Sequence, residues 1–462
     1  MDSEPLFELP PEEEQKANKK VGKPRVQRAD RKQIVVQWAA LDDWIPSDHL
    51  VRLVWEMVEE MDLRRFYEEI DAIEGGAGRA AIDPAILITL WLYATLQGVG
   101  SARELARMCE EHVAYRWILG GVTVNYHTLA DFRTTQEEKL DQLLKEGVAA
   151  LLDEGLINLE ETAQDGMRLR GGAGINSFHR RKTLEKHLQK AEERVEQLKH
   201  APEQSPRKAA AQNRAAREKV ERLQEALEVL GEIEKQREKA HRKKERKEPR
   251  VSETDSEVRI MKMPDGGFRP AVNVELTVDT AQQVILEVEL VNTVDQGQMM
   301  PMLEHIQESY GQYPERHLVD KGFVTIPDIE AAEGKGVAVY APVPDTYLKK
   351  QKETIPGKLP GESLSDTDAR PEPAPKQKKK DYSPGVQKWL ARMETEEAKA
   401  ICKHRPASVE CANADARNRG FYQVLVRGLQ KVRAVMLWFA LAHNLLRAYA
   451  LKKQKAATSA VM

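Results

Sequence analysis

The hydrophobic period of the chain changes near Gly155 from that of helices to that of strands, and this change constrains the fold more than any other feature. From Ile34 to about Leu152, apolar residues recur three and four residues apart, as in Leu50, Leu53, Val54, Met57, Val58 and Met61. Beyond Gly155, apolar and polar residues alternate, first in the run from Ile157 to Leu169, which predicts a strand. The sequence therefore predicts a helical domain over residues 33–152, followed by a domain built on a sheet.

The second domain is predicted to mix strands and helices. Alternating apolar residues predict a hairpin, with Val272, Val274, Leu276 and Val278 on one arm and Val284, Leu286, Val288 and Leu290 on the other. Further along, we expect a helix over 299–306, a strand over 317–319, a helix over 327–332, a strand over 337–341 and a terminal helix. A chain of 462 residues is long enough for two or three domains of ordinary size.

The N-terminal helices carry start and stop signals. Ser47 suits an N-cap for the helix that contains Leu50, and Asp83 with Pro84 begins a helix that runs to Gly98. Ser101 can cap the next helix, and Thr128 suits a cap within the segment NYHTLADFR. A helix, a short glycine-containing turn and a second helix resemble a helix-turn-helix.

Four basic residues of this region are candidates for DNA contacts: Arg103, Arg107, His127 and Arg133. Arginine pairs with phosphates or guanine edges, which favours a DNA-binding interpretation. The alternative is that these residues form the solvated faces of a helical bundle, since a charge on a helix is usually just exposed.

Several segments differ from the two domains. Residues 1–32 have few apolar groups and predict a disordered arm. Residues 180–250 carry two heptad seams, which predict an inserted coiled-coil hairpin that ends in the basic run KAHRKKERKEPR, residues 239–250. Residues 346–382 are rich in Lys, Pro, Asp and Ser and predict a flexible linker, and residues 451–462 predict a tail.

Composition predicts a soluble, cytoplasmic protein. The longest apolar run, residues 86–96, is too short to cross a bilayer and predicts a buried helix, so no membrane partner is expected. The first 20 residues contain no apolar stretch of signal-peptide type. Cys109, Cys402 and Cys411 show no zinc spacing. The net charge of −3 conceals local basic patches that would suit nucleic acid.

Three acidic residues stand in settings that suit a two-metal site. Asp165 lies in a predicted strand, Asp320 follows a short apolar strand, and Glu410 lies on a predicted helix beside small residues. Two Mg²⁺ ions roughly 3.5–4 Å apart require carboxylate oxygens around them before they can act in phosphoryl transfer. Taken singly, each acid has an ordinary interpretation: a turn at Asp165, a cap at Asp320, and an exposed helical residue at Glu410.

Three further carboxylates compete for such a role. Asp265 precedes Gly266 and predicts a turn, and Asp295 predicts the N-terminal cap of the helix that begins at Met299. Asp255 has no such explanation and stays open as a candidate.

Four blocks carry a resemblance to the DDE transposases of bacterial insertion sequences. They are MPDGGFRPAVNVELTVDT (263–280), VNTVDQGQMMPM (291–302), HLVDKGFVTIPDIE (317–330) and RPASVECANADARNRGFYQVLVRGLQKVRAVMLWFALAHNLLR (405–447). The resemblance extends from about Trp38 to Arg447. It implies an α/β ribonuclease H-like catalytic domain, with a mixed sheet flanked by helices, in two parts, 156–345 and 383–450. The all-α N-terminal domain would then be the DNA-binding domain, and the coiled-coil hairpin an insertion.

The resemblance also implies a site and partners. Asp165, Asp320 and Glu410 would be the catalytic acids and would hold two Mg²⁺ ions, with Mn²⁺ as a substitute. Arg405 and Arg417 lie where related transposases contact phosphates, and Cys402 stands roughly where that signature has a tyrosine. The implied partners are double-stranded DNA, as inverted repeats and target, and a second copy of the chain in a homodimer on DNA.

Two alternatives stay open. The first is a ribonuclease H-like nuclease or resolvase that shares the site but performs no strand transfer. The second is a catalytically inactive DNA-binding derivative of a transposase.

Overall fold

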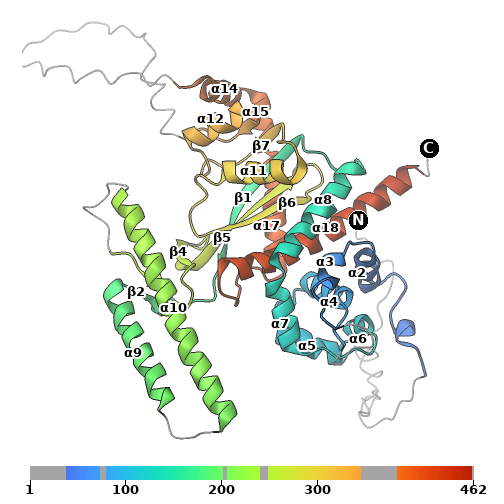
Figure 1. Ribbon diagram of the computed structural model, residues 1–462. Coiled ribbons are helices and arrows are strands. Elements are labelled where there is room, and N and C mark those ends of the chain that lie inside the picture. Colours follow the sequence, from blue (N-terminus) through green and yellow to red (C-terminus); the bar gives the residue numbers. More distant parts are fainter. Residues whose placement is uncertain (1–37, 73–79, 201–204, 240–247, 345–381, 460–462) are drawn as a thin grey trace, which may run out of the picture. The chain divides into compact units, whose positions relative to one another are not determined.

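The computed structural model describes residues 38–72, 80–200, 205–239, 248–344 and 382–459 (Figure 1). The predicted arm, residues 1–32, and nearly all of the predicted linker lie outside the described residues. The chain divides into two compact units, residues 1–44 and residues 45–462. In the first unit, a 3-10 helix spans Leu41–Trp44, and the backbone NH of Ala40 donates a hydrogen bond to Asp43 Oδ2 (2.9 Å).

The second unit begins with seven helices among the described residues. They are α2 (Leu50–Glu59), α3 (Arg64–Tyr67), α4 (Pro84–Leu96), α5 (Ala102–Glu111), α6 (Val113–Leu119), α7 (Tyr126–Thr135) and α8 (Glu137–Asp153). The helical period of this region is therefore confirmed. α4 is apolar nearly all round and is buried, which the apolar run had predicted.

The predicted caps are partly right. Ser101 Oγ accepts a hydrogen bond from the NH of Glu104, as predicted. The predictions for Ser47 and Thr128 are wrong: His49 Nδ1 caps α2, and Asn125 Oδ1 caps α7 by accepting from the NH groups of His127 and Thr128. In both cases the capping residue directly precedes the first helical residue, because only there can a short side chain reach the free NH groups.

In the part of the chain that the structure describes, the main sheet contains six strands. They are β1 (Glu161–Arg170), β4 (Arg259–Lys262), β5 (Phe268–Asp279), β6 (Ile285–Val291), β7 (Arg316–Leu318) and β8 (Ala338–Tyr340). β5 pairs antiparallel with β1 on one side, and on its other side with β6 and, near its N-terminal end, with β4. β1, β7 and β8 are parallel neighbours. The hairpin predicted from alternation is confirmed as β5 and β6, and β4 was not predicted.

Both faces of the sheet are covered, as a mostly buried sheet requires. On one face, Met167, Leu169, Val274 and Leu276 share a core with residues of α17 (Val409–Asn418) and α18 (Leu429–Ser459). On the other face lies α11 (Met299–Tyr310), where Gln164 of β1 donates to the backbone oxygen of Gln298 (3.2 Å). Successive residues of β1 therefore face α17 and α11 in turn.

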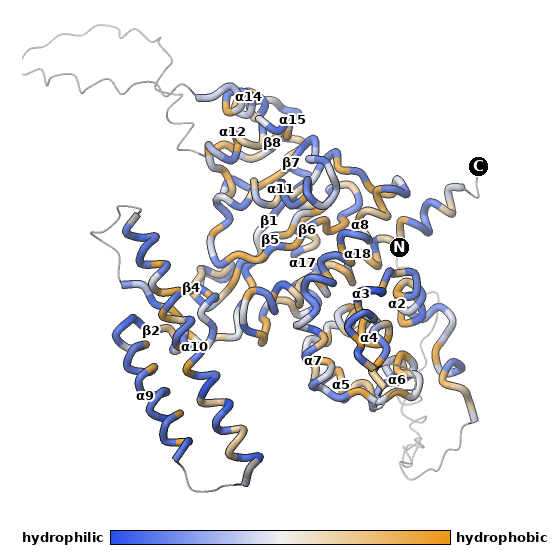
Figure 2. Tube along the Cα trace, viewed as in Figure 1, coloured by the Kyte–Doolittle hydropathy of each residue, from blue (hydrophilic) through white to orange (hydrophobic). Residues whose placement is uncertain are grey.

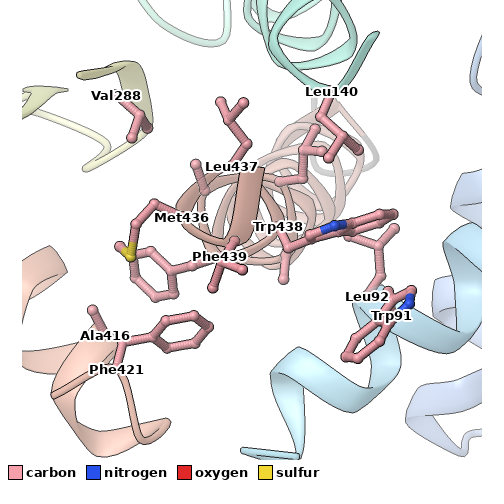
Figure 3. Close-up of a cluster of buried hydrophobic side chains, with 14 of the residues drawn as sticks. Trp91, Leu92, Leu140, Val288, Ala416, Phe421, Met436, Leu437, Trp438 and Phe439 are labelled. Atoms are coloured by element: carbon pink, nitrogen blue, oxygen red, sulfur yellow. The ribbon is translucent and has the colours of Figure 1, made fainter. Parts of the chain in front are cut away.

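α18 is the helix around which this core is built. Figure 3 shows Trp438 of α18 directed toward Trp91 and Leu92 of α4, and Phe439 directed toward Phe421. Trp438 Nε1 donates to the oxygen of Arg133 (3.1 Å), so this buried indole is satisfied. α18 is long and apolar enough to cross a membrane, but 78% of its apolar window is buried inside the protein. The predicted tail is helical as far as Ser459, because α18 continues through it.

The insertion consists of two helices, α9 (Arg181–Lys199) and α10 (Pro206–Lys239), preceded by a 3-10 turn, η2 (Ile175–Ser177), and by β2 (Phe178–His179), which pairs with β3 (Val251–Ser252). The two helices lie side by side, and most of their residues are hydrophilic (Figures 1 and 2). A small apolar core joins them: Leu184, Ala191, Leu223, Ala226, Leu230 and Val251. Most of the predicted basic run, residues 240–247, lies outside the described residues.

The rest of the second unit supports the edge of the sheet and the site. It contains α12 (Ile326–Gly334), α14 (Pro384–Met393), α15 (Glu396–Ile401) and α16 (His404–Ala407). Trp389 of α14 is fully buried in a core with residues of α11, α12 and β8.

Candidate active site

The sheet register brings two of the predicted acids side by side. Ala163 of β1 pairs with Leu318 of β7 in a parallel ladder. Asp165 and Asp320 each follow two residues later, so the two carboxyl-bearing residues emerge at the same level of neighbouring segments. Asp165 lies within β1, and Asp320 lies just past the end of β7.

The guanidinium group of Arg405 links Glu410 to Asp165. It is the second residue of α17, which packs on β1 and β5. Arg405, in the short helix α16, donates to Asp165 Oδ1 (3.1 Å) and to Glu410 Oε1 (2.7 Å). Asn413, one turn after Glu410, donates to Asp165 Oδ2 (2.8 Å). Both oxygens of Asp165 are therefore held in place.

The three carboxylates share one electrostatic environment without touching one another. Burial raises the pKa of Asp165 to about 6, Arg405 opposes this shift, and the charges of Asp320 and Glu410 add to it. Among the described residues, the carboxylate oxygens of Asp165, Asp320 and Glu410 do not all lie within 4.8 Å of one another. Arg405 lies between Asp165 and Glu410 and keeps them apart.

Two glycines adjoin this cluster, and neither has room for a side chain. A Cβ atom on Gly166 would lie 2.4 Å from Asp295 Oδ1 and 3.0 Å from the amide of Asn273. A Cβ atom on Gly322 would lie 2.8 Å from Asp320 Oδ1 and 3.7 Å from Asp295 Oδ2. The carboxylates of Asp295 and Asp320 therefore approach a common point beside β1.

The prediction that Asp295 caps the helix at Met299 is wrong. The residue before α11 is Gln298, which makes no side-chain cap, and Asp295 Oδ1 instead accepts a hydrogen bond from Asn273 Nδ2 (2.7 Å). Asp295 is too far from the first turn, and its side chain turns toward β5 and β1. Asp255, the candidate left open, is buried elsewhere and accepts from the NH groups of Glu257 and Gly428. Asp265 lies in a turn, as predicted, and pairs with Arg269.

A buried polar network lies under the cluster on the α11 side. Glu275 Oε1 accepts from Asn273 and Glu275 Oε2 from Gln164 (2.7 and 3.0 Å). Burial raises the pKa of Glu275 to about 8, and the charges of Asp295, Asp165 and Asp320 contribute to that shift. These residues were not predicted as part of the site. Their signal in the sequence was the polar alternation of Asn273, Glu275 and Thr277 within β5, which is typical of a solvated face but is buried here.

The basic residues predicted to contact DNA divide into two groups. Arg103, Arg107, His127 and Arg417 are exposed; Arg103 stacks on the ring of Tyr126, and Arg107 pairs weakly with Glu111 at 3.9 Å. Arg133 is only 9% exposed, lies over the ring of Trp91 and donates to Gly100 O. Its burial lowers the pKa of the guanidinium to about 10. Arg133 therefore holds α7 against α4, and its side chain is not exposed as the other four are.

The chemistry of the site follows from its donors. Carboxylate and amide oxygens are the ligands that Mg²⁺ and Mn²⁺ prefer. Several acids converge at the end of parallel strands, and Arg405 is the one basic residue that forms an ion pair with Asp165, Asp295, Asp320 or Glu410 among the described residues. These four carboxylates outnumber the one guanidinium, and a divalent ion would supply further positive charge.

Comparison with known families gives one match. Residues 39–135 match the model of a family described as Transposase domain (DUF772). The matched residues end with α7, before the segments that carry the carboxylates. No curated protein and no solved structure gives a significant match to the chain. The similarity supports a transposase, and so an activity on DNA.

Proposed function

We propose that this chain is a DDE transposase whose catalytic domain has the ribonuclease H-like fold. The observation that carries the proposal is the convergence of three acids: Asp165 on β1 and Asp320 just past β7 lie side by side, and the guanidinium of Arg405 joins Asp165 to Glu410 of α17. The strand order β6-β5-β1-β7-β8, with β5 antiparallel to both neighbours and the other pairs parallel, supports the fold. The transposase-domain match in the preceding helices supports the activity.

In this proposal Asp165, Asp320 and Glu410 hold the two Mg²⁺ ions, with Mn²⁺ as a substitute. The ions supply activation of water and stabilisation of the leaving oxyanion. Water then hydrolyses a strand at the element end, and the freed 3′-OH attacks the target strand in a second phosphoryl transfer.

Arg405 and Asn413 have distinct tasks in this site. Asn413 orients Asp165 through the hydrogen bond to Oδ2. Arg405 neutralises Asp165 and Glu410 before a cation is bound. With a cation bound, the Arg405 guanidinium would no longer be needed by the carboxylates and could pair with a DNA phosphate.

We propose the exposed residues Arg103, Arg107, His127 and Arg417 as DNA contacts, and we leave out Arg133 because it is buried. Both ends of an element are cut and joined together, so the chain would act on double-stranded DNA as a homodimer. The proposed location is the cytoplasm.

The test compares wild-type protein with Asp165→Asn on DNA that carries the inverted repeats flanking the gene. The amide keeps the shape of the side chain and removes the charge that a metal ligand needs, so cleavage should fall by a factor of about 10³ or more while end binding persists. Asp265→Asn, an exposed turn acid, is the matched control and should cleave normally. Full cleavage by Asp165→Asn would overturn the proposal.

The products decide between a transposase and a nuclease. Joining of the cleaved 3′ ends to a second DNA molecule supports the transposase. Metal-dependent cleavage without joining, and without preference for the repeats, would support the ribonuclease H-like nuclease instead.

A further inference from the structure

The acidic site has two halves, and only one of them contains a basic side chain. Arg405 lies in the half formed by Asp165 and Glu410. In the other half, Asp295 and Asp320 have no ion pair with a basic residue in the described part of the chain. We propose that Asp295 is a fourth carboxylate of the active site and binds a divalent cation together with Asp320. This inference rests on the proposed function and extends it by one residue.

The geometry shows that space is kept for the Asp295 carboxylate. Asp295 approaches from the α11 side and fills the volume that any side chain at Gly166 would occupy, since a Cβ there would lie 2.4 Å from Oδ1. Its other oxygen, Oδ2, approaches the same point beside Gly322 as Asp320 Oδ1. The two carboxylates thus approach one region beside Gly322, whose NH donates a hydrogen bond to Asp320 Oδ1.

The partners of Asp295 are too few for a carboxylate that serves only structure. Its Oδ1 accepts from Asn273 Nδ2, whereas its Oδ2 accepts no hydrogen bond from the described residues. A half-buried carboxylate that pairs for stability normally has a cation or several NH donors. Asp295 instead lies close enough to the buried Glu275 that its negative charge helps to raise the pKa of that carboxyl.

Asn273 supplies an independent sign of a ligand. Its side chain is fully buried, and its Nδ2 donates both to Glu275 Oε1 and to Asp295 Oδ1. Its Oδ1 has no partner and lies 3.0 Å from the position of a Gly166 Cβ, beside Asp295 Oδ1. A buried amide oxygen without a donor loses hydration free energy, and a cation or its hydration water would restore it. Asn273 is accordingly a positioning residue that fixes Asp295.

The test is Mn²⁺ binding to the full-length protein without DNA, measured from the electron paramagnetic resonance signal of free Mn²⁺. Asp295→Asn keeps the acceptor for Asn273 and removes the charge, so Mn²⁺ affinity should fall about tenfold or more. Asp265→Asn should bind as the wild type does. Gly166→Ala gives a second route, because its Cβ displaces the Asp295 carboxylate and should weaken binding in the same direction.

The outcomes separate this inference from the proposed function. If Asp165→Asn loses Mn²⁺ binding while Asp295→Asn and Gly166→Ala bind as the wild type does, the role of Asp295 is refuted and the three-acid site stands. If the wild type binds no Mn²⁺, or Asp165→Asn binds it normally, the three-acid site itself fails. Circular dichroism on each variant checks folding, and Gly166→Ala decides if Asp295→Asn does not fold.

A separate cluster at the root of the inserted helices has the composition of a transition-metal site. His179 of β2, His187 of α9 and Glu253 each offer one ligand atom, and these atoms all lie within 4.8 Å of one another. Glu253 Oε2 lies 2.6 Å from His187 Nδ1 and 3.9 Å from His179 Nε2. We infer that these three residues bind a zinc-like divalent ion that fixes the start of α9 to the β2–β3 ribbon.

The backbone places these ligands close to the separations that a metal requires. β2 and β3 pair through Phe178 and Ser252, and the NH of Glu253 donates to Ser177 O, so His179 and Glu253 have little freedom to move apart. Ligand atoms around tetrahedral zinc lie roughly 3.3 Å apart, given bonds of about 2.0–2.2 Å. The two distances to Glu253 bracket that value, and small side-chain rotations would reach it. All three residues are half-buried, which leaves access for an ion and for a fourth ligand.

The test titrates the full-length protein with Co²⁺ in the presence of excess Mg²⁺, which occupies oxygen-ligand sites. Visible absorption bands of Co²⁺ with nitrogen ligands are expected, and Zn²⁺ should displace them. His187→Ala and Glu253→Gln should each lower the affinity about tenfold or more, whereas His200→Ala, an exposed histidine near the other end of α9, should not. Absence of the bands in the wild type, or equal binding by His187→Ala and Glu253→Gln, would overturn this inference.

Discussion

Replacement of Arg433 by Met should detach the N-terminal helices from the sheet. Arg433 lies on α18 and forms ion pairs with Glu137 and Asp141 of α8 and with Glu289 of β6 (3.0 Å to Glu289). Its side chain is 15% exposed, and it also donates to Val288 O (3.0 Å). One guanidinium therefore joins the helical region, the long helix and the six-stranded sheet.

The magnitude follows from what the substitution leaves behind. Met fills similar space but leaves three partly buried carboxylates facing each other, and breaking a buried ion pair in this way costs about 3–5 kcal/mol. Lys145 still pairs with Asp141 (2.8 Å), so we expect the lower end, about 3 kcal/mol. The neighbouring acids raise the folded-state pKa of Arg433 above its usual 12.5. The contribution of Arg433 to the free energy of unfolding is therefore present in full at every pH below 12.5, and it does not change over the pH range of an ordinary assay.

The measurement is urea unfolding, followed by tryptophan fluorescence for the helical region and by far-ultraviolet circular dichroism for the whole chain. Arg433→Met should lower the free energy of unfolding and shift the fluorescence transition in particular, since Trp91 and Trp438 lie in the core that α18 shares with the helices. Lys431→Met, an exposed change two residues earlier, is the control.

A compensating variant tests the reason for the loss. Adding Glu137→Gln and Asp141→Asn to Arg433→Met removes two of the three stranded charges and should recover most of the stability. If Arg433→Met lowers the free energy of unfolding by less than about 1 kcal/mol, or if the triple variant recovers no stability, the ion pairs of Arg433 do not stabilise the protein in this way.

Three further predictions concern stability. His317 is fully buried, and burial lowers its pKa to about 3. Its contribution to stability is therefore present above about pH 6.5 and is lost, by up to about 5 kcal/mol, as the pH falls toward 3. His317→Gln should therefore reduce the loss of thermal stability between pH 7 and pH 4. Asp279 has the opposite pH dependence. Burial raises its pKa to about 6, so its contribution to stability is present below about pH 3.8 and is lost as the pH rises through 6. Asp279→Asn should therefore gain stability relative to the wild type at pH 8 but not at pH 4, by at most about 3 kcal/mol, and equal effects at both pH values would contradict the assignment. Trp438→Ala should lower the free energy of unfolding in urea by about 3–5 kcal/mol, because it leaves a cavity beside Trp91, and Trp438→Phe should lower it much less. Similar losses for the two variants would instead point to the hydrogen bond of the indole.

The sequence by itself determined the elements whose signals are local. Alternation in residues 272–290 predicted the β5–β6 hairpin, and the helical period predicted α2, α4 and α11, because hydrophobic spacing reports the face that a segment buries. It also placed Asp165 on a strand, Asp320 after one and Glu410 on a helix, although the metal-binding role of these acids stays a prediction. Caps were less certain, since several polar residues near a helix start can compete and only the adjacent one reaches the free NH groups.

The tertiary structure alone decided which polar residues are covered and which of them meet. Asn273 and Glu275 look like one solvated face of β5, yet α11 covers that face and turns them into a buried network beneath the acids. Arg133 looks like the other basic residues of its region, yet Trp91 covers its guanidinium. Asp295 resembles a cap in sequence, but Gly166 leaves space that its carboxylate fills. Periodicity describes contacts between residues a few positions apart, whereas these contacts join segments more than 100 residues apart, or residues on different elements, and depend on how helices pack on the sheet.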